Sequence, residues 1–400
     1  MKILIVSQYF WPEEFRINDL AVDLVKRGFD VSVLTGNPNY PKGKFYKGYG
    51  SRYSVELYKG IKIYRVPIIA RGTNSFQLIL NYLSFVWSGV IFAIFHKENY
   101  DKIFAVNFSP ITAVFPAIVY KHINKIPLYL WVQDLWPESV SAAGKIQSKL
   151  LNNLLTKMVK IIYKKSDKVL VQSEAFCPSI VNKGVSEEQL EYMPNWAEDL
   201  YSDISKRTIE KFVSTLPIGF KVMFAGNIGE AQDFYSIIKA AEISKNYSDI
   251  KWIIIGDGRK KAWVESEIIR LGLQSTVYML GRYPVAEMPS FFRHADIMLL
   301  TLKDEYIFSL TIPSKVQSYM ASEKPIVGML NGVGADVIRK ADCGYISNAG
   351  DYKALAKSVI DAYNQDPNFL LEKGKNGKKY YDMNFSKKVI IDNLIKILQD

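Results

Sequence analysis

Gly219-Phe-Lys-Val-Met-Phe-Ala225, followed directly by Gly226-Asn-Ile-Gly229, has the pattern of a buried strand that ends in a glycine turn. A helical pattern follows near residues 234–245, and further apolar runs alternate with helical patterns after it. The same alternation opens the chain at Lys2-Ile-Leu-Ile-Val-Ser-Gln8, and a break at residues 192–197 separates the two arrays. Alternating strands and helices are typical of parallel sheets with helices on both faces. The sequence therefore predicts two doubly wound α/β domains in tandem.

The predicted strands also indicate where a ligand binds. Apart from the two quoted above, they fall at residues 31–35, 61–67, 102–106, 128–131, 168–171, 252–255, 277–280, 297–300, 325–328 and 344–346. Ligands of doubly wound sheets bind at the carboxyl ends of the strands, so two facing sheets put the site in the cleft between the domains. We expect a first domain at residues 1–198, a second at 199–385 and a last amphipathic helix at 386–400.

Composition and charge exclude several classes of protein. Among the 400 residues, two cysteines and three scattered histidines argue against a disulfide scaffold and a metal cluster, and there is no Asp-x-Asp triplet. We therefore expect no metal, in a reduced cytoplasmic compartment. Residues 1–183 hold 24 Lys and Arg against 12 Asp and Glu (+12), whereas residues 184–400 hold 27 against 28 (−1). Such a basic field attracts phosphates, nucleic acid or anionic lipid, but no nucleic-acid-binding motif is present, so we expect no nucleic acid.

Two segments of the first domain are candidates for membrane contact. Residues 72–95 carry no charge and are long enough to span a bilayer. We reject spanning because the segment connects two strands predicted for one sheet, 61–67 and 102–106. Its polar residues form one narrow stripe, which fits either a well-buried crossover helix or a helix whose apolar flank meets lipid. Residues 145–165 form an amphipathic pattern with six lysines and no acid. We favour contact of this second helix with anionic lipid over a core-packed helix with solvated lysines.

Three predicted strands of the second domain end in turns that suit a phosphate. The first carries Gly226, the second Gly256 and Asp257, and the third Gly281 and Arg282. A turn that leads into a helix can aim backbone N–H groups at phosphate oxygens. Each turn taken alone is equally compatible with a plain strand–helix connection.

A helix predicted to begin at Pro313 is the sharpest local feature, because proline suits the first helical position. The free N–H groups of this helix, the hydroxyls of Ser309, Thr311 and Ser314 and the ammonium of Lys315 can converge on a diphosphate. The alternative is an ordinary capped helix with a solvent-exposed lysine. We favour the phosphate site because several strand ends of the same domain point to the same kind of ligand.

In the first domain, Asp134 follows the predicted strand at 128–131 and therefore lies at the carboxyl edge of the sheet. A carboxylate in this place can orient or deprotonate a hydroxyl nucleophile; the alternative is a helix N-cap. Loops on the same side supply the acceptor-binding candidates, which are Glu13, Glu14, Arg16, Asn39, Trp136 and Glu138. Glu138 is equally compatible with a first-turn helix charge.

Six motifs together resemble the family 4 glycosyltransferases, which have the GT-B fold. They are Ile5-Val-Ser-Gln-Tyr-Phe-Trp-Pro-Glu13, Asn37-Pro-Asn-Tyr-Pro-Lys-Gly43, Gln133-Asp-Leu-Trp-Pro-Glu-Ser139, Ala225-Gly-Asn-Ile-Gly229, Ile255-Gly-Asp-Gly258 and Ile312-Pro-Ser-Lys-Val-Gln-Ser-Tyr-Met-Ala-Ser-Glu-Lys-Pro-Ile-Val327. The chain is most similar to the L-fucosamine or N-acetylhexosamine transferases of surface-polysaccharide assembly. The resemblance implies two Rossmann-like domains that face each other across a cleft, and a C-terminal helix that returns to the N-terminal domain.

The chain departs from the family pattern at the donor site. The family's E-x7-E pair reads Leu310 and Ser318 here, so both carboxylates are absent, and Gln317 is the candidate to replace the second one at the ribose. The usual Arg and Lys after the first glycine turn read Asn227 and Gln232. The full set of candidates is Gly226, Asn227, Gly229, Gln232, Gly256, Asp257, Ser309, Leu310, Thr311, Ser314, Gln317 and Ser318 for donor binding, and Asp134, Lys315 and Arg282 for catalysis.

The resemblance implies a metal-independent, retaining transfer from a UDP-sugar, with the nucleotide sugar as substrate and no cofactor. The expected sugar is an N-acetylated amino or deoxyamino hexose. The expected acceptor is a saccharide or a polyprenol-diphosphate-linked sugar of capsule or O-antigen assembly, at the inner face of the cytoplasmic membrane. Two alternatives remain: a UDP-sugar 2-epimerase of the same fold, and a protein that binds a nucleotide sugar without turnover. The epimerase is less favoured because its chemistry needs more titratable groups in the cleft.

Overall fold

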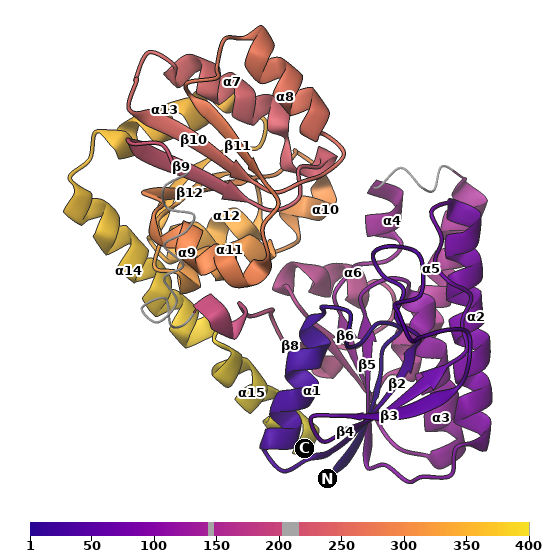
Figure 1. Cartoon of the computed structure of the whole chain (residues 1–400). Coiled ribbons are helices and arrows are strands. Elements are labelled where there is room, and N and C mark those ends of the chain that lie inside the picture. Colours follow the sequence, from indigo (N-terminus) through magenta and orange to yellow (C-terminus); the bar gives the residue numbers. More distant parts are fainter. Residues whose placement is uncertain (143–147, 202–215, 400) are drawn as a thin grey trace. The chain divides into compact units, whose positions relative to one another are not determined.

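The computed structural model describes residues 1–142, 148–201 and 216–399 and divides the chain into two compact units (Figure 1). The first unit consists of Met1–Met193 and Ile391–Asp400, and the second of Pro194–Ile390. The last helix, α15 (Lys387–Gln399), therefore begins in the second unit and ends in the first. Its Asp392 pairs with Arg27, which caps the end of α1 (Arg16–Lys26). The expected return of the C-terminal helix to the N-terminal domain is confirmed.

The first unit is built on one eight-stranded sheet in the order β3-β4-β2-β1-β5-β6-β7-β8. The strands are β1 (Lys2–Val6), β2 (Asp30–Gly36), β3 (Ser54–Tyr58), β4 (Ile61–Val66), β5 (Lys102–Asn107), β6 (Leu128–Val132), β7 (Lys168–Val171) and β8 (Leu190–Tyr192). All neighbours are parallel except β3, which pairs antiparallel with β4. The six strands predicted here are confirmed. Sequence reasoning missed β8, which has three residues, and β3, an edge strand whose Val55 and Leu57 are exposed.

Helices lie on both faces of this sheet. Besides α1 they are α2 (Ser75–Phe95), α3 (Phe115–Asn124), α4 (Glu138–Ala142), α5 (Lys149–Lys165) and α6 (Cys177–Val181). Figure 1 shows α2, α3 and α5 on one side of the sheet and α1 on the other. Ile17, Leu20, Ala21 and Leu24 recur at helical spacing and are the buried residues of α1, so burial of one apolar stripe fixes this helix against the strands.

Helix α2 is the crossover connection between β4 and β5, two strands of one sheet, in agreement with the rejection of a membrane span. Its length and composition would allow it to cross a membrane, yet only 28% of its apolar window is buried. Asn81, Phe85, Gly89, Phe92 and Ala93 are buried. The opposite flank is apolar and exposed, and it consists of Phe76, Ile79, Leu83, Trp87, Ile91, Ile94 and Phe95. The interpretation of a well-buried helix is therefore wrong for this flank.

Helix α5 confirms the predicted basic amphipathic helix from Lys149 onward. Lys145 and Ile146, which the sequence assigned to the same helix, lie outside the described residues. The buried side of α5 consists of Val159, Ile162 and Tyr163. Its exposed residues include Leu150, Leu151, Leu154, Lys157, Lys160, Ile161, Lys164 and Lys165. Leucines and lysines are thus exposed together. Only one stripe of the apolar residues of α5 packs against the core.

The second unit is built on a six-stranded, all-parallel sheet in the order β11-β10-β9-β12-β13-β14. The strands are β9 (Phe220–Ala225), β10 (Ile250–Ile255), β11 (Val277–Gly281), β12 (Ile297–Thr301), β13 (Ile326–Met329) and β14 (Gly344–Ser347). The helices are α7 (Phe234–Ser244), α8 (Lys261–Arg270), α9 (Met288–Arg293), α10 (Tyr306–Ser309), α11 (Ser314–Ala321), α12 (Val333–Lys340), α13 (Tyr352–Tyr363) and α14 (Pro367–Asn384). All six predicted strands are confirmed.

Two apolar clusters hold the helices of the second unit against its sheet. One cluster joins the sheet to α7, α8 and α13, and the other joins it to α9, α11, α12 and α14. Figure 1 shows these two sets of helices on opposite sides of the strands. Burial on both faces explains why the central strands read as continuous apolar runs.

Both sheets contain the same six-strand order, and its direction reverses between β1 and β5 in one unit and between β9 and β12 in the other. Such a reversal leaves a crevice at the carboxyl ends of the strands, where doubly wound proteins bind their ligands. The fold of each unit therefore points to the loops that follow its central strands.

Candidate functional site

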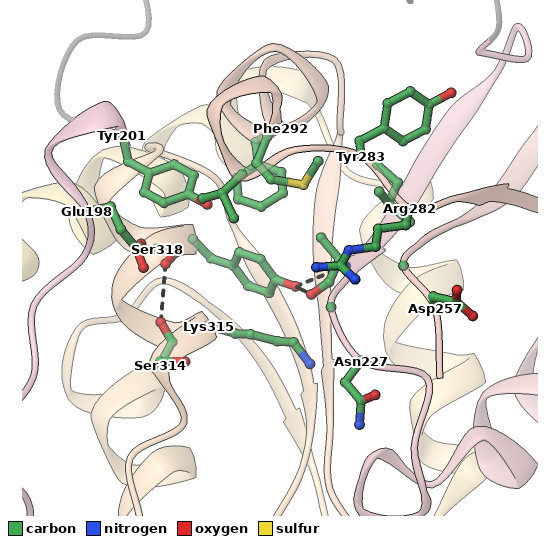
Figure 2. A pocket seen from close by; sticks show the side chains of 17 residues that line it. Glu198, Tyr201, Asn227, Asp257, Arg282, Tyr283, Phe292, Ser314, Lys315 and Ser318 are labelled. Carbon is green, nitrogen blue, oxygen red and sulfur yellow. Dashed lines mark hydrogen bonds between the residues drawn. The ribbon is translucent and has the colours of Figure 1, made fainter. Parts of the chain in front are cut away.

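A hollow of about 610 Å³ opens at the carboxyl ends of β9, β10 and β11 in the second unit (Figure 2). Loops after these strands and residues of α9 and α11 form its walls. The lining residues are Glu198, Tyr201, Ala225, Gly226, Asn227, Ile255, Gly256, Asp257, Arg282, Tyr283, Val285, Met288, Phe292, Ser314, Lys315, Ser318 and Tyr319. The hollow thus lies where the strand order of the second unit predicts a ligand.

Two glycines are required by the close packing of the turns beneath the hollow. Gly226 has φ +144°, and a Cβ there would lie 2.6 Å from Cε of Lys315. Gly256 has φ +150°, and a Cβ there would lie 1.8 Å from the carbonyl oxygen of Gly226. L side chains rarely adopt such φ values, and both positions lack the space for one. Glycine therefore lets two strand-end turns and a lysine side chain come together.

Lys315 is a cationic group that lies against the turn at Gly226. It lies in the first turn of α11, its side chain points into the hollow (Figure 2), and Nζ lies 4.2 Å from the ring centroid of Phe224. The described residues place no carboxylate within ion-pair distance of this ammonium. Burial lowers the pKa of Lys315 to about 8, because the charged form loses its hydration. A half-buried lysine without a counterion at a helix start is suited to bind a phosphate.

Helix α11 begins one residue later than the sequence indicates. Pro313, predicted at the first helical position, is the residue before the first turn, and no side chain caps this end. The first-turn N–H groups of Ser314 and Lys315 have no partner within the helix. The phosphate-binding geometry predicted for this helix start therefore rests on Ser314 and Lys315, both of which line the hollow.

Polar and aromatic side chains surround the rest of the hollow. Figure 2 shows Arg282 and Lys315 pointing into it from different sides. Tyr201 and Phe292 stack with ring centroids 5.4 Å apart, and aromatic faces of this kind are suited to a planar base or a sugar ring. Glu198 lines the hollow together with Ser318. The hollow therefore combines cations, aromatic rings and the two carboxylates Glu198 and Asp257.

The structure divides the predicted donor residues into two groups. Gly226, Asn227, Gly256, Asp257, Arg282, Ser314, Lys315 and Ser318 line the hollow, whereas Gly229, Gln232, Ser309, Leu310, Thr311 and Gln317 do not. The hydroxyls of Ser309 and Thr311 instead donate to the carbonyls of Tyr306 and Ile307. Gln317 is fully buried, and the backbone carbonyl of Gln232 accepts from Thr301. These side chains and backbone groups shape the loops around the site.

Sequence reasoning missed Glu198, Tyr201, Tyr283 and Phe292 as residues of the hollow. Tyr283 directly follows the turn at Gly281 and Arg282, so that motif already pointed toward it. Glu198 and Tyr201 belong to the connection that follows the first unit, and no motif marks them. Only the three-dimensional path of the chain brings these two residues to the hollow.

Asp134 lies at the corresponding edge of the first unit, after β6. The half-buried carboxylate accepts no side-chain hydrogen bond from the described residues, although Nδ2 of Asn107 donates to the Asp134 carbonyl at 3.0 Å. Burial raises the pKa of Asp134 to about 7. The N-cap alternative does not hold, because α4 begins at Glu138. A carboxylate with a pKa near neutrality is suited to take a proton from a hydroxyl group.

Glu13 has a similar pKa but a different environment. It is 2% exposed, and its Oε1 accepts from the backbone N–H groups of Asn39 and Tyr40 at 2.7 and 2.6 Å. Burial raises its pKa to about 7. Oδ1 of Asn39 accepts in turn from the backbone N–H of Arg71. Glu13 and Asn39 therefore hold three loops together at the carboxyl edge of the first sheet.

The other predicted acceptor residues differ in exposure. Glu138 is held by Lys183 and Ser179, with Nζ of Lys183 2.5 Å from Oε1, and Trp136 is 8% exposed. Glu14 is exposed, and Arg16 begins α1 in a half-buried position. Glu138 and Trp136 thus contribute to the packing of this edge, and Glu14 remains open to solvent.

An aromatic cluster, missed by sequence reasoning, completes this edge. Tyr9 and Phe15 stack with centroids 5.2 Å apart, and Tyr40 and Phe108 lie against Phe15. Arg71 lies on the Tyr40 ring, 5.1 Å from its centroid. The cluster comes from loops after β1, β2, β4 and β5, so no local motif reveals it. Within the described residues, no group of three His, Cys, Asp or Glu side chains is placed to hold a metal ion.

Comparison with known families agrees with this architecture in both units. Residues 14–196 match the family model described as "Glycosyl transferase 4-like domain". Residues 207–380 match the model described as "Glycosyl transferases group 1". The first model covers β2 to β8 of the first unit, and the second covers β9 to β14 of the second unit.

Two bacterial relatives are similar over different lengths. WbjE of Pseudomonas aeruginosa, named a glycosyltransferase, is 28% identical over 58% of this chain and 58% of its own, so the match spans less than two thirds of that protein. WcaI of Escherichia coli, whose name assigns it as a glycosyl transferase to colanic acid biosynthesis, is 23% identical over 80% of this chain and 81% of its own.

Solved structures share the fold at low identity. Sucrose-phosphate synthase from Thermosynechococcus elongatus has a TM-score of 0.76 and 14% identity, covering 100% of this chain and 98% of its own. Anabaena HepE, solved in complex with UDP and glucose, has a TM-score of 0.67 and 18% identity over the full length of both chains. At these identities the likeness shows the fold alone, which is the expected GT-B fold of two parallel-sheet α/β units.

Proposed function

We propose that this chain, whose two units match glycosyltransferase domain models, transfers a sugar from a UDP-sugar to a lipid-linked or saccharide acceptor in surface-polysaccharide assembly. The observation that carries the proposal is Lys315, a half-buried lysine beside the glycine turns of the second unit, with no ion-pair partner among the described residues. Glycosyl transfer builds negative charge on the leaving diphosphate, and a cation already fixed in place stabilises that charge. The names of WcaI and WbjE, and the UDP complex of HepE, support the same class of reaction.

The resemblance to the family supplies the finer parts of the proposal. They are a retaining and metal-independent transfer, an N-acetylated amino or deoxyamino hexose as the sugar, and a polyprenol-diphosphate-linked acceptor. Asp134 is the proposed group that orients or deprotonates the acceptor hydroxyl, because its carboxylate is half-buried and has no hydrogen-bond donor among the described side chains. Lys315 and Arg282 are the proposed cations at the leaving diphosphate.

The test is an incubation of the protein with radiolabelled UDP-sugars and a membrane extract that contains lipid-linked acceptors. Label in the lipid fraction supports transfer. Conversion of the UDP-sugar to an isomer without acceptor supports the 2-epimerase alternative. Protection of the protein by UDP-sugars, with every product absent, supports the binding-protein alternative. Asp134→Asn is the matched control, because we expect it to bind UDP but not to transfer the sugar. Label that enters the lipid fraction with this variant comes from other enzymes in the extract.

We also propose that the first unit lies on an anionic membrane surface, at the inner face of the cytoplasmic membrane. The exposed apolar flank of α2 supports this, because a soluble protein rarely leaves seven large apolar residues of one helix exposed. The exposed lysines of α5 support it as well, since each lysine near an anionic surface contributes about 1 kcal/mol. Figure 1 shows α5 and α2 on the same side of the sheet.

A further inference from the structure

Arg71, in the connection between β4 and α2, is a cation that the described part of the fold does not neutralise. Nη1 donates to the hydroxyl of Tyr9 at 2.9 Å, and the guanidinium lies 5.1 Å from the ring centroid of Tyr40. Its backbone N–H donates to Oδ1 of Asn39. These contacts fix the side chain on an aromatic surface. None of them supplies a negative charge, and Arg71 forms no ion pair with any described residue.

Arg65, six residues earlier on β4, shows what a neutralised arginine looks like in the same region. It is fully buried and pairs with Glu56, and it donates to the carbonyls of Gly36 and Trp11. A guanidinium has five N–H donors, and a buried one needs acceptors and a counterion to offset its lost hydration. The chain supplies both to Arg65. Around half-buried Arg71 the described residues supply an aromatic surface but no counterion.

Two tyrosine hydroxyls add donors to this place. Burial raises the pKa of Tyr9 well above its usual range, so the hydroxyl keeps its proton and can donate it to an anionic oxygen. Tyr82, on α2, is close enough for the charges of both Arg71 and Asp134 to act on its hydroxyl. Tyr82 is therefore near both the unpaired cation and the carboxylate proposed as the base.

We propose that Arg71, with the hydroxyls of Tyr9 and Tyr82, binds a phosphate group of the acceptor. The planar guanidinium matches the geometry of phosphate oxygens, and the tyrosines complete the donor set. This inference deepens the proposed function and rests on it: an acceptor in which a single sugar is linked to a lipid carries its diphosphate next to the sugar that reacts. Binding of that diphosphate at Arg71 places the acceptor sugar on the side of Tyr82 and Asp134.

Acceptor titrations with two matched acceptors test the proposal. One is a polyprenyl-diphosphate-linked sugar, and the other is the same sugar on an uncharged alkyl chain. We expect Arg71→Gln to raise the KM for the diphosphate acceptor about 10- to 100-fold, the range for loss of hydrogen bonds to a charged group. The KM for the uncharged acceptor and the Kd for UDP should not change. Arg71→Lys keeps the charge but lacks the planar pair of N–H donors, so its KM for the diphosphate acceptor should lie between those of the wild type and Arg71→Gln. Arg52→Gln, on the exposed surface, should have the KM of the wild type.

Three results would overturn the assignment. An unchanged KM for the diphosphate acceptor in Arg71→Gln removes Arg71 from the site. Equal increases in KM for both acceptors, with a lower Tm, show that Arg71 only holds the loops in place. A dependence on Arg71 that appears with an acceptor bearing a carboxylate, and not with the diphosphate acceptor, assigns the site to a carboxylate and contradicts the phosphate.

A second measurement separates this proposal from the proposed function. Inorganic diphosphate is titrated into Lys315→Ala protein, in which the hollow of the second unit has lost its lysine, and into the Lys315→Ala/Arg71→Gln double variant. We expect heat of binding in calorimetry for the first protein and at least tenfold weaker binding for the second. If this difference is found while no UDP-sugar yields a product, the transferase proposal fails and the anion site stands. If transfer occurs and the two proteins bind diphosphate alike, the anion site fails alone.

Discussion

The same connection in the two units, from the third strand of the shared order to the fourth, is made in opposite ways. In the second unit it runs through α9, a helix of six residues of which five are buried. In the first unit it runs through α2, a helix of 21 residues with an exposed apolar flank. The second unit thus uses this connection to line its own hollow, whereas the first unit leaves the apolar flank of α2 exposed.

The carboxyl edges of the two sheets also differ in how they are built. Glycine turns and the start of α11 form the edge of the second unit, where half-buried Lys315 has no ion-pair partner among the described residues. Side chains that hold one another form the edge of the first unit: Glu13 accepts from backbone N–H groups, and Arg65 pairs with Glu56. Asp134 and Arg71 are the exceptions there. Buried or half-buried charges that the fold does not satisfy mark the places where a ligand completes the structure.

The largest effect is expected from Asp134→Asn. This variant tests whether a carboxylate that accepts no hydrogen bond has a role that a hydrogen-bonded carboxylate lacks. Loss of a general base lowers kcat about 10²- to 10⁴-fold, and UDP binding in the second unit should not change. Glu13→Gln is the matched control: its pKa is also near 7, and a Gln oxygen still accepts from Asn39 and Tyr40. Equal losses in the two variants, measured as initial rates, would remove the distinction between these carboxylates.

The pH dependence of these carboxylates follows from the direction of their pKa shifts. Burial raises both pKa values to about 7, so the folded chain keeps protons that the unfolded chain releases as pH rises from about 4 to about 7. The free energy of unfolding should therefore fall as pH rises through this window, and Asp134→Asn should reduce that fall. The rate should rise with pH up to about 7, since the base must be ionised. Denaturant melts and rates between pH 4.5 and 8.5 check both; a wild-type stability independent of pH contradicts the assignment.

The second effect concerns Lys315 and the glycine edge. Lys315→Ala should weaken UDP binding about 10- to 100-fold, the range for loss of a hydrogen bond to a charged group. Lys324 is the matched control: burial also lowers its pKa, but its ammonium donates to the carbonyls of Arg293 and Ala295 outside the hollow. Lys324→Ala should lower the Tm and leave the Kd for UDP unchanged. Calorimetric titration decides, and equal UDP affinity in Lys315→Ala would refute the phosphate site.

A smaller effect is expected from Gly226→Ala. A Cβ at this position meets the end of the Lys315 side chain, which can move aside, so UDP binding should weaken only about three- to tenfold. Gly272→Ala is the control, because Gly272 has positive φ but open space around it. Its strain should lower the Tm without any change in the Kd for UDP. If both variants weaken UDP binding equally, general loosening of the second unit explains the effect better than displacement of Lys315.

The alternation of apolar runs and helical patterns was enough to predict both sheets, because parallel strands buried on two faces carry a strong signal. The strand-end rule then located Lys315, Arg282 and Asp134. Edge strand β3 escaped prediction because half of its side chains face solvent. Pro313 was placed one residue too far into the helix, because the φ that the proline ring fixes suits both helical and extended backbone; its φ of −61° is helical, but its ψ of 134° is extended.

The rest of the candidate site depends on contacts between distant segments. Arg71 meets Tyr9 from a loop 62 residues away, and no local pattern distinguishes it from Arg65, which the fold neutralises. Glu198 and Tyr201 reach the hollow from the connection between the units. The predicted Gln317, by contrast, turns inward on the same helix that presents Ser314 and Ser318. Helical spacing predicts which residues share a face, but packing decides which face meets the ligand.

The smallest effect returns to the contrast between α2 and α9. Trp87→Gln places a polar side chain at the middle of the exposed flank of α2, where the tryptophan is 72% exposed. Partial burial of this ring in a lipid surface contributes about 1 kcal/mol, so binding to anionic vesicles should weaken about fivefold. Tyr306→Gln is the control, since Tyr306 is 74% exposed in the second unit. Cosedimentation with vesicles that contain or lack anionic lipid measures both variants. Equal binding of Trp87→Gln and wild type would mean that the apolar flank of α2 is covered by another protein surface. Any attraction to the vesicles would then come from the charge of the α5 lysines alone.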